Sequence, residues 1–237
     1  MIKAVTFDCW HTILNNDEEM EKLRLKYRIK SMLSIFKSKN INVLERELKK
    51  AIDDVNKKSS YIREKEWIEV TPEQQLTLIL QKLSIKQDSL LHRELLEPYT
   101  KAALTFIPTL MSGVEEIIPK IANYMPIALI CNTGVTPGRV IRQIFDYYDL
   151  SKYFITMVFS DEFGLAKPHP NIFREAMLYL KGIPCNNILH VGDDLFSDIK
   201  GGQSVGMKTV FLGDENQDDS KLESIKSLVD LEFIIFK

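Results

Sequence analysis

The sequence predicts an α/β protein in which a parallel β-sheet with helices on both faces is interrupted, close to its start, by an all-helical insertion. Three observations support this prediction. A short apolar stretch opens the chain and ends at a carboxylate, Asp8. Residues 15–105 then show only helical periodicity, and after Phe106 apolar strands alternate with amphipathic helices. Such alternation is typical of a parallel sheet, because parallel neighbours need a crossover connection that is usually a helix.

The opening stretch, Ala4–Phe7, is predicted to be a buried strand. Its residues are mostly apolar and partly β-branched, and the stretch is too short for a helix. Asp8 follows at once, and a carboxylate at the end of a buried strand is costly to desolvate unless a site uses it. Because ligands of open α/β sheets bind at the carboxyl ends of the strands, Asp8 marks the expected site.

The domain division follows from the change in periodicity. Residues 1–14 and 106–237 are predicted to form the α/β core, and residues 15–105 a helical domain inserted into it. The insertion leaves the core directly after Asp8 and Thr12. We therefore expect it to cover the carboxyl ends of the strands, which is the position of a lid.

Four helices are expected in the insertion. Apolar residues recur at helical spacing in two groups, Leu25, Ile29, Met32, Leu33 and Phe36, and then Leu44, Leu48, Ala51, Ile52 and Val55. Thr71 and Pro72 are the expected N-cap and first residue of a third helix. A fourth is expected over residues 88–100, with an interruption at Pro98.

Beyond Phe106 the expected elements alternate. The expected strands are 127–130, 157–159, 188–191 and 209–212, and the expected helices are 114–121, 136–145, 170–180 and 196–205. The tail is expected to form a helix from Ser220 and a last strand at Phe233–Phe236.

The bulk properties indicate an ordinary globular protein. The chain has 237 residues, of which 45% are hydrophobic and 27% charged, and its net charge of −2 gives no field that favours nucleic acid or an anionic membrane. Three cysteines are too few, and oddly numbered, for a disulfide framework. No stretch approaches the ~18–20 apolar residues of a membrane span, and Asp8 interrupts the early apolar run that a signal peptide would need. We expect a cytoplasmic protein with neither a nucleic-acid nor a membrane partner; the sequence does not indicate its oligomeric state.

Polar residues also follow three of the later stretches that resemble strands. They are Cys131–Asn132–Thr133–Gly134, Lys167–Pro168, and Gly192–Asp193–Asp194 with Asp198. Three carboxylates gathered at one point, from Asp8, Asp193 and Asp198, would need a cation, and hard oxygen ligands suit Mg²⁺. Each stretch alone also fits a simpler explanation, a polar turn, a helix N-cap or a solvated lysine.

Together these stretches resemble the four motifs of the haloacid dehalogenase (HAD) superfamily. The motifs here are Phe7-Asp8-Cys9-Trp10-His11-Thr12, then Cys131-Asn132, then Lys167-Pro168, and finally Gly192-Asp193-Asp194 with Asp198. All four occur in the family's order. The resemblance implies the family's Rossmann-like core, with residues 15–105 at the place of its helical C1 cap.

The resemblance also implies a chemistry, the Mg²⁺-dependent hydrolysis of a small phosphorylated metabolite. Asp8 would be the nucleophile that forms an aspartyl-phosphate, and Lys167 would stabilise charge on the nucleophile and the phosphoryl group. Mg²⁺ would be bound by Asp8, Asp193 and the carbonyl of Trp10. Asp198 would be a weaker metal partner or would support the other ligands.

The remaining site residues are assigned by the same resemblance. Thr12, Cys131 and Asn132 fall at positions that hold the phosphate or support the residues that do. Trp10, beside the nucleophile, is expected to line the substrate entry. A lid closed over the site favours a small-molecule phosphoester over a protein or a nucleic acid.

Two departures from the family pattern matter. Trp10 stands where the family's phosphatases carry an Asp that acts as general acid and base, and the loss of such a group typically reduces the rate ~10²–10⁴-fold. Turnover is therefore expected to be slow unless a cap residue or water substitutes or the leaving group is good. Cys131 stands where Ser or Thr is usual, and a thiol is the weaker hydrogen-bond donor.

Trp10 also leaves two alternatives open. The family's metal-independent 2-haloacid dehalogenases carry an aromatic residue at this position, although they lack the Gly-Asp motif that is present here as Gly192-Asp193. A non-catalytic binding protein on the same fold is the other alternative. Gly192-Asp193 favours a phosphatase over a dehalogenase. The presence of Asp8, Lys167 and Asp193 counts against a binding protein, whereas Trp10 counts for one.

Overall fold

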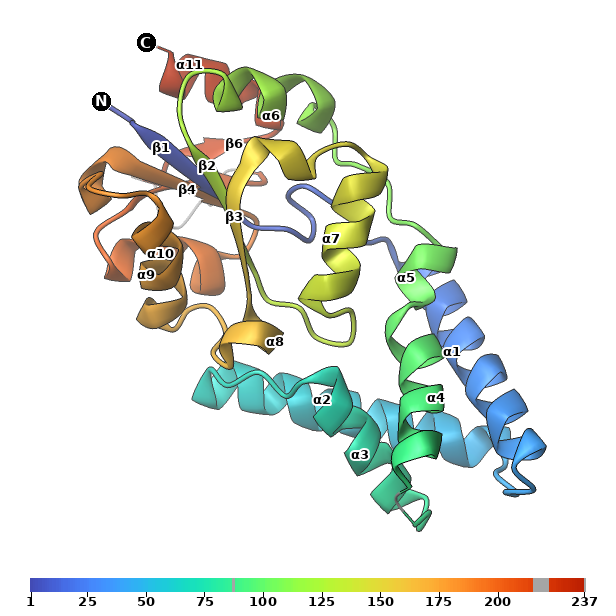
Figure 1. Cartoon of the computed structure of the whole chain (residues 1–237). Coiled ribbons are helices and arrows are strands. Elements are labelled where there is room, and N and C mark those ends of the chain that lie inside the picture. Colours follow the sequence, from blue (N-terminus) through green and yellow to red (C-terminus); the bar gives the residue numbers. More distant parts are fainter. Residues whose placement is uncertain (87, 215–221, 237) are drawn as a thin grey trace.

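The computed structural model describes residues 1–86, 88–214 and 222–236. These residues form a six-stranded sheet with the order β3-β2-β1-β4-β5-β6, and every neighbouring pair of strands is parallel (Figure 1). The strands are β1 Ala4–Phe7, β2 Ile127–Cys131, β3 Phe154–Phe159, β4 Ile188–Gly192, β5 Lys208–Leu212 and β6 Ser224–Ile225. The predicted Rossmann-like α/β fold is confirmed.

Helices connect the strands and build the insertion. The α-helices are α1 Glu18–Ser38, α2 Glu45–Glu66, α3 Pro72–Lys82, α4 Ser89–Thr100, α5 Ala102–Thr105, α6 Val114–Ala122, α7 Gly138–Tyr147, α8 Ser160–Phe163, α9 Pro170–Tyr179, α10 Gly201–Ser204 and α11 Glu232–Ile235. Short 3₁₀ segments are η1 Ser151–Tyr153, η2 Cys185–Asn187 and η4 Leu228–Leu231, and η3 Leu195–Lys200 is a π-helix.

Apolar residues bury both faces of the sheet. On one face, α6, α7, η4 and α11 pack their apolar sides against alternate residues of the strands, such as Val5, Phe7 and Leu129. On the other face, α9 packs against Ala4 and Ile130. β1, β2 and β4 are buried along their whole length, as expected of central strands of a sheet that is covered on both sides.

The helices α1 to α4 share a hydrophobic cluster of their own, which extends away from the sheet (Figure 1). Most of the apolar positions predicted from the sequence are buried in it, including Met32, Phe36, Leu48 and Ile52. Leu44 is an exception, because it is the N-cap of α2 and is exposed. Polar caps begin three of these helices: Asp17 caps α1, Thr71 forms a capping box with Gln74 on α3, and Asp88 caps α4. The division of domains at 14/15 and 105/106 remains a prediction. No helix in the described ranges is long and apolar enough to cross a membrane.

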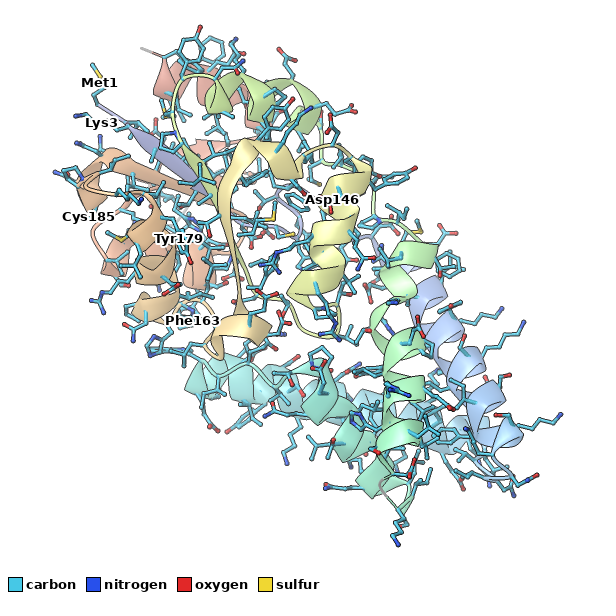
Figure 2. All side chains as sticks on the ribbon, viewed as in Figure 1. Met1, Lys3, Asp146, Phe163, Tyr179 and Cys185 are labelled. Atoms are coloured by element: carbon cyan, nitrogen blue, oxygen red, sulfur yellow. The ribbon has the colours of Figure 1, made fainter. Side chains whose placement is uncertain are left out.

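The insertion lies at the carboxyl ends of the strands. Figure 2 shows Met1 and Lys3, which precede β1, at the side of the sheet away from the insertion, and Phe163 on α8 between the sheet and α2. A short antiparallel contact joins the two parts of the chain: Ile68 pairs with Leu165 in an isolated bridge.

Two sequence expectations need correction. Helix α4 continues through Pro98 to Thr100. The proline removes one backbone donor, and the buried side chains of Leu95 and Tyr99 on either side of it keep the last turn in place. The stretch Phe233–Phe236 is not a strand but falls mostly in α11, and the sixth strand is Ser224–Ile225; a short apolar run does not by periodicity alone distinguish a helix from a strand. The helix expected from Ser220 begins outside the described residues.

Candidate active site

Four strands direct polar residues toward one edge of the sheet. Asp8 directly follows β1, Asn132 follows β2, Ser160 follows β3 and Asp193 follows β4. Because β3, β2, β1 and β4 are consecutive neighbours in a parallel sheet, these residues lie at the same edge. The backbone N–H of Asp8 donates to the carbonyl of Val191 (2.8 Å), which fixes the end of β1 against β4.

Lys167 joins two carboxylates in the floor of the site. Its Nζ donates to Oδ1 of Asp8 and to Oδ1 of Asp198, the latter at 2.6 Å. All three side chains are buried. Burial acts to lower the pKa of Lys167, but the charges of Asp198 and Asp8 outweigh it and raise that pKa above its usual value. Lys167 is therefore a permanent cation whose charge two carboxylates share.

Asp198 is surrounded by donors. Besides Lys167, His190 Nε2 lies 3.2 Å from its Oδ1, and the backbone N–H of Asp194 donates to its Oδ2 (3.1 Å). Burial acts to raise the pKa of Asp198, but Lys167 and the hydrogen bond with His190 lower it to about 2. A Cβ at Gly192 would lie 2.3 Å from Cγ of Asp198, so only glycine lets the carboxylate approach the end of β4. This explains the glycine of the Gly-Asp motif.

Asp193 completes a group of three carboxylates. One oxygen each of Asp8, Asp193 and Asp198 lie within 4.8 Å of one another. The hydroxyl of Thr12 lies 3.4 Å from both Asp8 Oδ2 and Asp193 Oδ1, so it contacts two of the carboxylates. Burial and the charge of Asp8 raise the pKa of Asp193 to about 7, and burial also raises the pKa of Asp8 despite Lys167. Excess negative charge at this point favours a bound cation.

The carboxylates open into a cavity of about 430 Å³. Asp8, Lys167, Asp193 and Asp198 line it from the core, together with Trp10. The insertion contributes residues as well, which are Asn16, Glu21 and Arg63. The cavity is of the size that suits a small molecule.

The second motif lies beside the third. Asn132 lines the cavity and exchanges two hydrogen bonds with the backbone of Lys167: Nδ2 donates to its carbonyl (3.0 Å), and Oδ1 accepts from its N–H (2.8 Å). Cys131 is fully buried in the core and does not line the cavity. Burial raises the pKa of the Cys131 thiol well above its usual value. The structure therefore brings Asn132, but not the Cys131 side chain, to the cavity.

Trp10 forms part of the cavity wall. Its side chain is half-buried, packs against the core cluster and lines the cavity beside Asp8. His11, which also lines the cavity, has a left-handed backbone with φ of 57°. Its N–H donates to the carbonyl of Leu14 (2.7 Å), so the chain turns sharply here, just before it enters the insertion.

Sequence reasoning missed a second polar cluster, between the insertion and the core. Buried Glu69 lies 3.4 Å from Nη1 of Arg63 and accepts a hydrogen bond from Ser160 Oγ (2.6 Å). Ser160 Oγ in turn accepts from the backbone N–H of Thr133 (2.9 Å). Ser160 directly follows a predicted strand, and that signal could have identified it; no sequence pattern marks Arg63 or Glu69.

Comparison with known proteins assigns the family. A model of the haloacid dehalogenase-like hydrolases matches residues 2–206. The chain belongs to this family. It is 25% identical to the glyceraldehyde 3-phosphate phosphatase of Methanocaldococcus jannaschii, over 98% of this chain and 97% of that protein. Matches to the phosphatases of the same name from Pyrococcus abyssi and Pyrococcus furiosus, at 41% and 44% identity, span only 26% and 34% of those proteins and 27% and 33% of this chain.

Solved structures of this family share the fold. The chain is similar to a 2-haloacid dehalogenase from Pseudomonas syringae (TM-score 0.73, 18% identity, covering 100% of this chain and 99% of that one). It is also similar to the HAD-hydrolase YfnB from Bacillus subtilis, solved with bound magnesium (TM-score 0.64, 20% identity, covering 99% and 98%). The proteins similar to this chain thus include both a phosphatase and a dehalogenase. The fold therefore does not distinguish between the two activities.

Proposed function

We propose that this HAD-like hydrolase is a phosphatase that removes phosphate from a small phosphomonoester through an aspartyl-phosphate on Asp8. The observation that carries the proposal is the Asp8 carboxylate, which lines the cavity, is bound by Lys167 and lies among two further carboxylates. The M. jannaschii relative, which matches almost end to end, is named as a phosphatase of a small phosphorylated aldehyde.

The reaction would proceed in two displacements. A carboxylate oxygen of Asp8 forms a bond to phosphorus, and the bond from phosphorus to the ester oxygen breaks, so that the leaving oxygen departs with the bonding electron pair and takes up a proton. Water then attacks phosphorus and gives up a proton to the solvent, the acyl phosphate bond breaks, and Asp8 is released as a carboxylate together with inorganic phosphate. Lys167 neutralises charge on Asp8 as the phosphate approaches, and its pairing with Asp198 holds the ammonium group in place.

The carboxylates fit a magnesium ion. Asp8 and Asp193 would bind it with the backbone carbonyl of Trp10, since hard oxygen ligands are those that Mg²⁺ prefers. Asp198 is less free to be a ligand because its oxygens already accept from Lys167, His190 and the Asp194 N–H. A bound Mg²⁺ would neutralise charge between the carboxylates and the phosphate dianion.

Trp10 sets the expected substrate preference. Its indole cannot protonate the leaving oxygen, so esters whose leaving group is stable as an anion should react fastest. We therefore expect p-nitrophenyl phosphate to be hydrolysed faster than alkyl phosphates. Asn132 anchors the Lys167 backbone and borders the cavity, where it would support the bound phosphate. Thr12 would support the carboxylates instead.

The first experiment is phosphate release from p-nitrophenyl phosphate and small alkyl phosphoesters by the wild type and by Asp8→Asn, with Mg²⁺ and with EDTA. Release should require the metal and fall by at least ~10³-fold in Asp8→Asn, because the nucleophile is lost. Glu18→Gln, on an exposed glutamate of α1, serves as the control. Full activity of Asp8→Asn, or activity in EDTA equal to that in Mg²⁺, would contradict the proposal.

A dehalogenase is the second candidate, and Trp10 beside Asp8 in the cavity is the observation that favours it. In that reaction Asp8 would attack carbon and displace halide. Chloride release from 2-chloropropionate without metal, in the absence of phosphate release, would establish this activity in place of the first.

A further inference from the structure

Arg63 is the cation that the insertion contributes to the cavity. Among the cavity-lining residues in the described part of the chain, Arg63 and Lys167 are the lysine and arginine cations. Two of the three donors on Lys167 Nζ are used by Asp8 and Asp198, at the floor of the cavity where the phosphate would bind. The Arg63 side chain is 26% exposed, and it comes from α2 rather than from the sheet. It is therefore a cationic group of the insertion that can meet a substrate.

The guanidinium of Arg63 keeps donors to spare. Its Nη1 lies 3.4 Å from Glu69 Oε1 and its Nη2 lies 3.5 Å from Ser60 Oγ, both at the long limit of hydrogen bonding. A guanidinium has five N–H donors, so these two weak contacts leave most of its capacity unused. Such a group can exchange weak partners for a stronger acceptor on a ligand.

Glu69 fixes the position of Arg63 relative to the core. It is 3% exposed and accepts a hydrogen bond from the Ser160 hydroxyl at 2.6 Å. Ser160 is held by the backbone N–H of Thr133. These partners follow β2 and β3, so the Glu69 carboxylate is attached to the loop that borders the cavity.

Arg63 lies directly over that loop. A Cβ built on Gly134 would be 3.4 Å from Arg63 Nη1, and Gly134 has φ of +63°. The pairing of Ile68 with Leu165 and two backbone hydrogen bonds, from Glu69 N–H to the Gly164 carbonyl (3.2 Å) and from Ala166 N–H to the Trp67 carbonyl (2.8 Å), hold the segment after α2 against the chain that leads to Lys167. The placement of Arg63 is thus tied to the placement of Lys167.

We propose that Arg63 is a specificity-determining residue that binds a carboxylate or carbonyl oxygen of the substrate beyond the ester oxygen, and that Glu69 positions it. The substrate class is then a short phosphomonoester whose carbon chain carries such an acceptor near the ester. This inference rests on the phosphatase function proposed above.

The test compares phosphoesters that share a size but differ in the acceptor. Phosphoglycolate carries a carboxylate, glycolaldehyde phosphate carries a carbonyl, and ethyl phosphate carries neither. Arg63→Met should raise KM for one or both of the first two about 10- to 100-fold, the value of a charge-assisted hydrogen bond, and should change KM for ethyl phosphate little. The two acceptor substrates show which oxygen group Arg63 binds.

Matched variants separate recognition from structure. Arg63→Lys should restore part of the loss, and Glu69→Gln should raise KM for the acceptor substrates more than it raises KM for ethyl phosphate. Arg46→Met, which removes an exposed arginine from the other end of the same helix, is the control. It should leave the ratio of KM for the acceptor substrates to KM for ethyl phosphate unchanged. Thermal unfolding of each variant reports any loss of fold.

Failure of the inference about Arg63 and failure of the proposed phosphatase function give different results. Equal effects on all three esters, or weaker inhibition by inorganic phosphate in Arg63→Met, would overturn the inference, because Arg63 would then act on the fold or on the phosphate itself. If the wild type releases phosphate neither from these esters nor from p-nitrophenyl phosphate, the proposed function fails. Calorimetric binding of the same esters to Asp8→Asn and to Asp8→Asn with Arg63→Met still decides the role of Arg63: an acceptor-dependent difference supports it, and equal binding overturns it.

Discussion

Two charge clusters lie at the carboxyl ends of the strands. They differ in whether burial or ion pairing has the larger effect on the pKa of the buried carboxylate. In the core cluster, burial acts to raise the pKa of Asp198, but Lys167 at 2.6 Å and His190 lower it to about 2. In the cluster between insertion and core, burial raises the pKa of Glu69, and Arg63 at 3.4 Å only partly opposes it. The first cluster is closed and tightly paired, whereas the second is loose and partly exposed.

This difference suits two different tasks: the tight cluster holds reacting groups in place, and the loose cluster can rearrange to bind a substrate. A nucleophile and its cation must be held at one distance, because small displacements of reacting groups cost large factors in rate. A residue that recognises the rest of a substrate must instead release its resting partner when a ligand arrives. The weakly bonded guanidinium of Arg63 meets this second requirement, and the short contacts of Lys167 meet the first.

The largest expected effect comes from breaking the tight cluster. Lys167→Met leaves Asp8 and Asp198 buried without their cation, and removal of one partner of a buried pair costs about 3–5 kcal/mol of stability. The same change should reduce phosphate release by ~10²–10³-fold, because the charge on the phosphoryl group loses its partner. Urea unfolding at pH 7 and steady-state kinetics measure the two effects.

Lys200→Met is the control for this variant, since Lys200 is an exposed lysine at the end of η3. A Lys167→Met protein that is as stable and as active as the control would show that the cluster is not the tightly paired unit described here.

A smaller effect is expected when the missing proton donor is supplied. Trp10→Asp places a carboxyl group beside Asp8 on the cavity wall, and it should raise kcat for alkyl phosphates by ~10–10²-fold, below the full range of general acid catalysis because the new group lacks supporting contacts. The rate with p-nitrophenyl phosphate should rise much less. Trp67→Asp, outside the cavity lining, is the control, and a uniform change on all esters would mean that Trp10 acts through packing alone.

The two clusters also differ in how far the sequence predicted them. The residues of the first cluster each follow an expected strand or stand in a recognisable motif; they are Asp8, Lys167, Asp193 and Asp198. Because the carboxyl ends of parallel strands lie at one edge of the sheet, such residues are expected to meet there. Arg63 stands in a long helix where periodicity reports only which face packs.

The cluster between insertion and core could not be read in the same way. Glu69 follows a left-handed cap at Trp67, and its role depends on how the insertion docks, which no local pattern encodes. Cys131 illustrates the opposite case. It matches a motif position, yet its thiol is buried in the core cluster and away from the cavity lining.

The smallest expected effect is a change with pH in the stability that Glu69 contributes. It tests whether burial outweighs Arg63 in setting the pKa of Glu69. Because the pKa of Glu69 is raised in the folded state, the folded protein binds this proton more tightly than the unfolded chain. The contribution of Glu69 to stability is then fully present below its unfolded pKa, about 4.3, and is lost as the pH rises through its higher folded value. Glutamine does not titrate, so the free energy of unfolding of the wild type minus that of Glu69→Gln should fall as the pH rises from about 4.5.

Urea unfolding between pH 4.5 and 8, conditions chosen to bracket that rise, gives the difference at each pH. Glu66→Gln, at the exposed end of α2, controls for the loss of one carboxylate. A difference that grows with pH would mean that Arg63 outweighs burial, as Lys167 does for Asp198. The second cluster would then be a tight ion pair like the first, and Arg63 would be held too firmly to exchange Glu69 for a substrate oxygen.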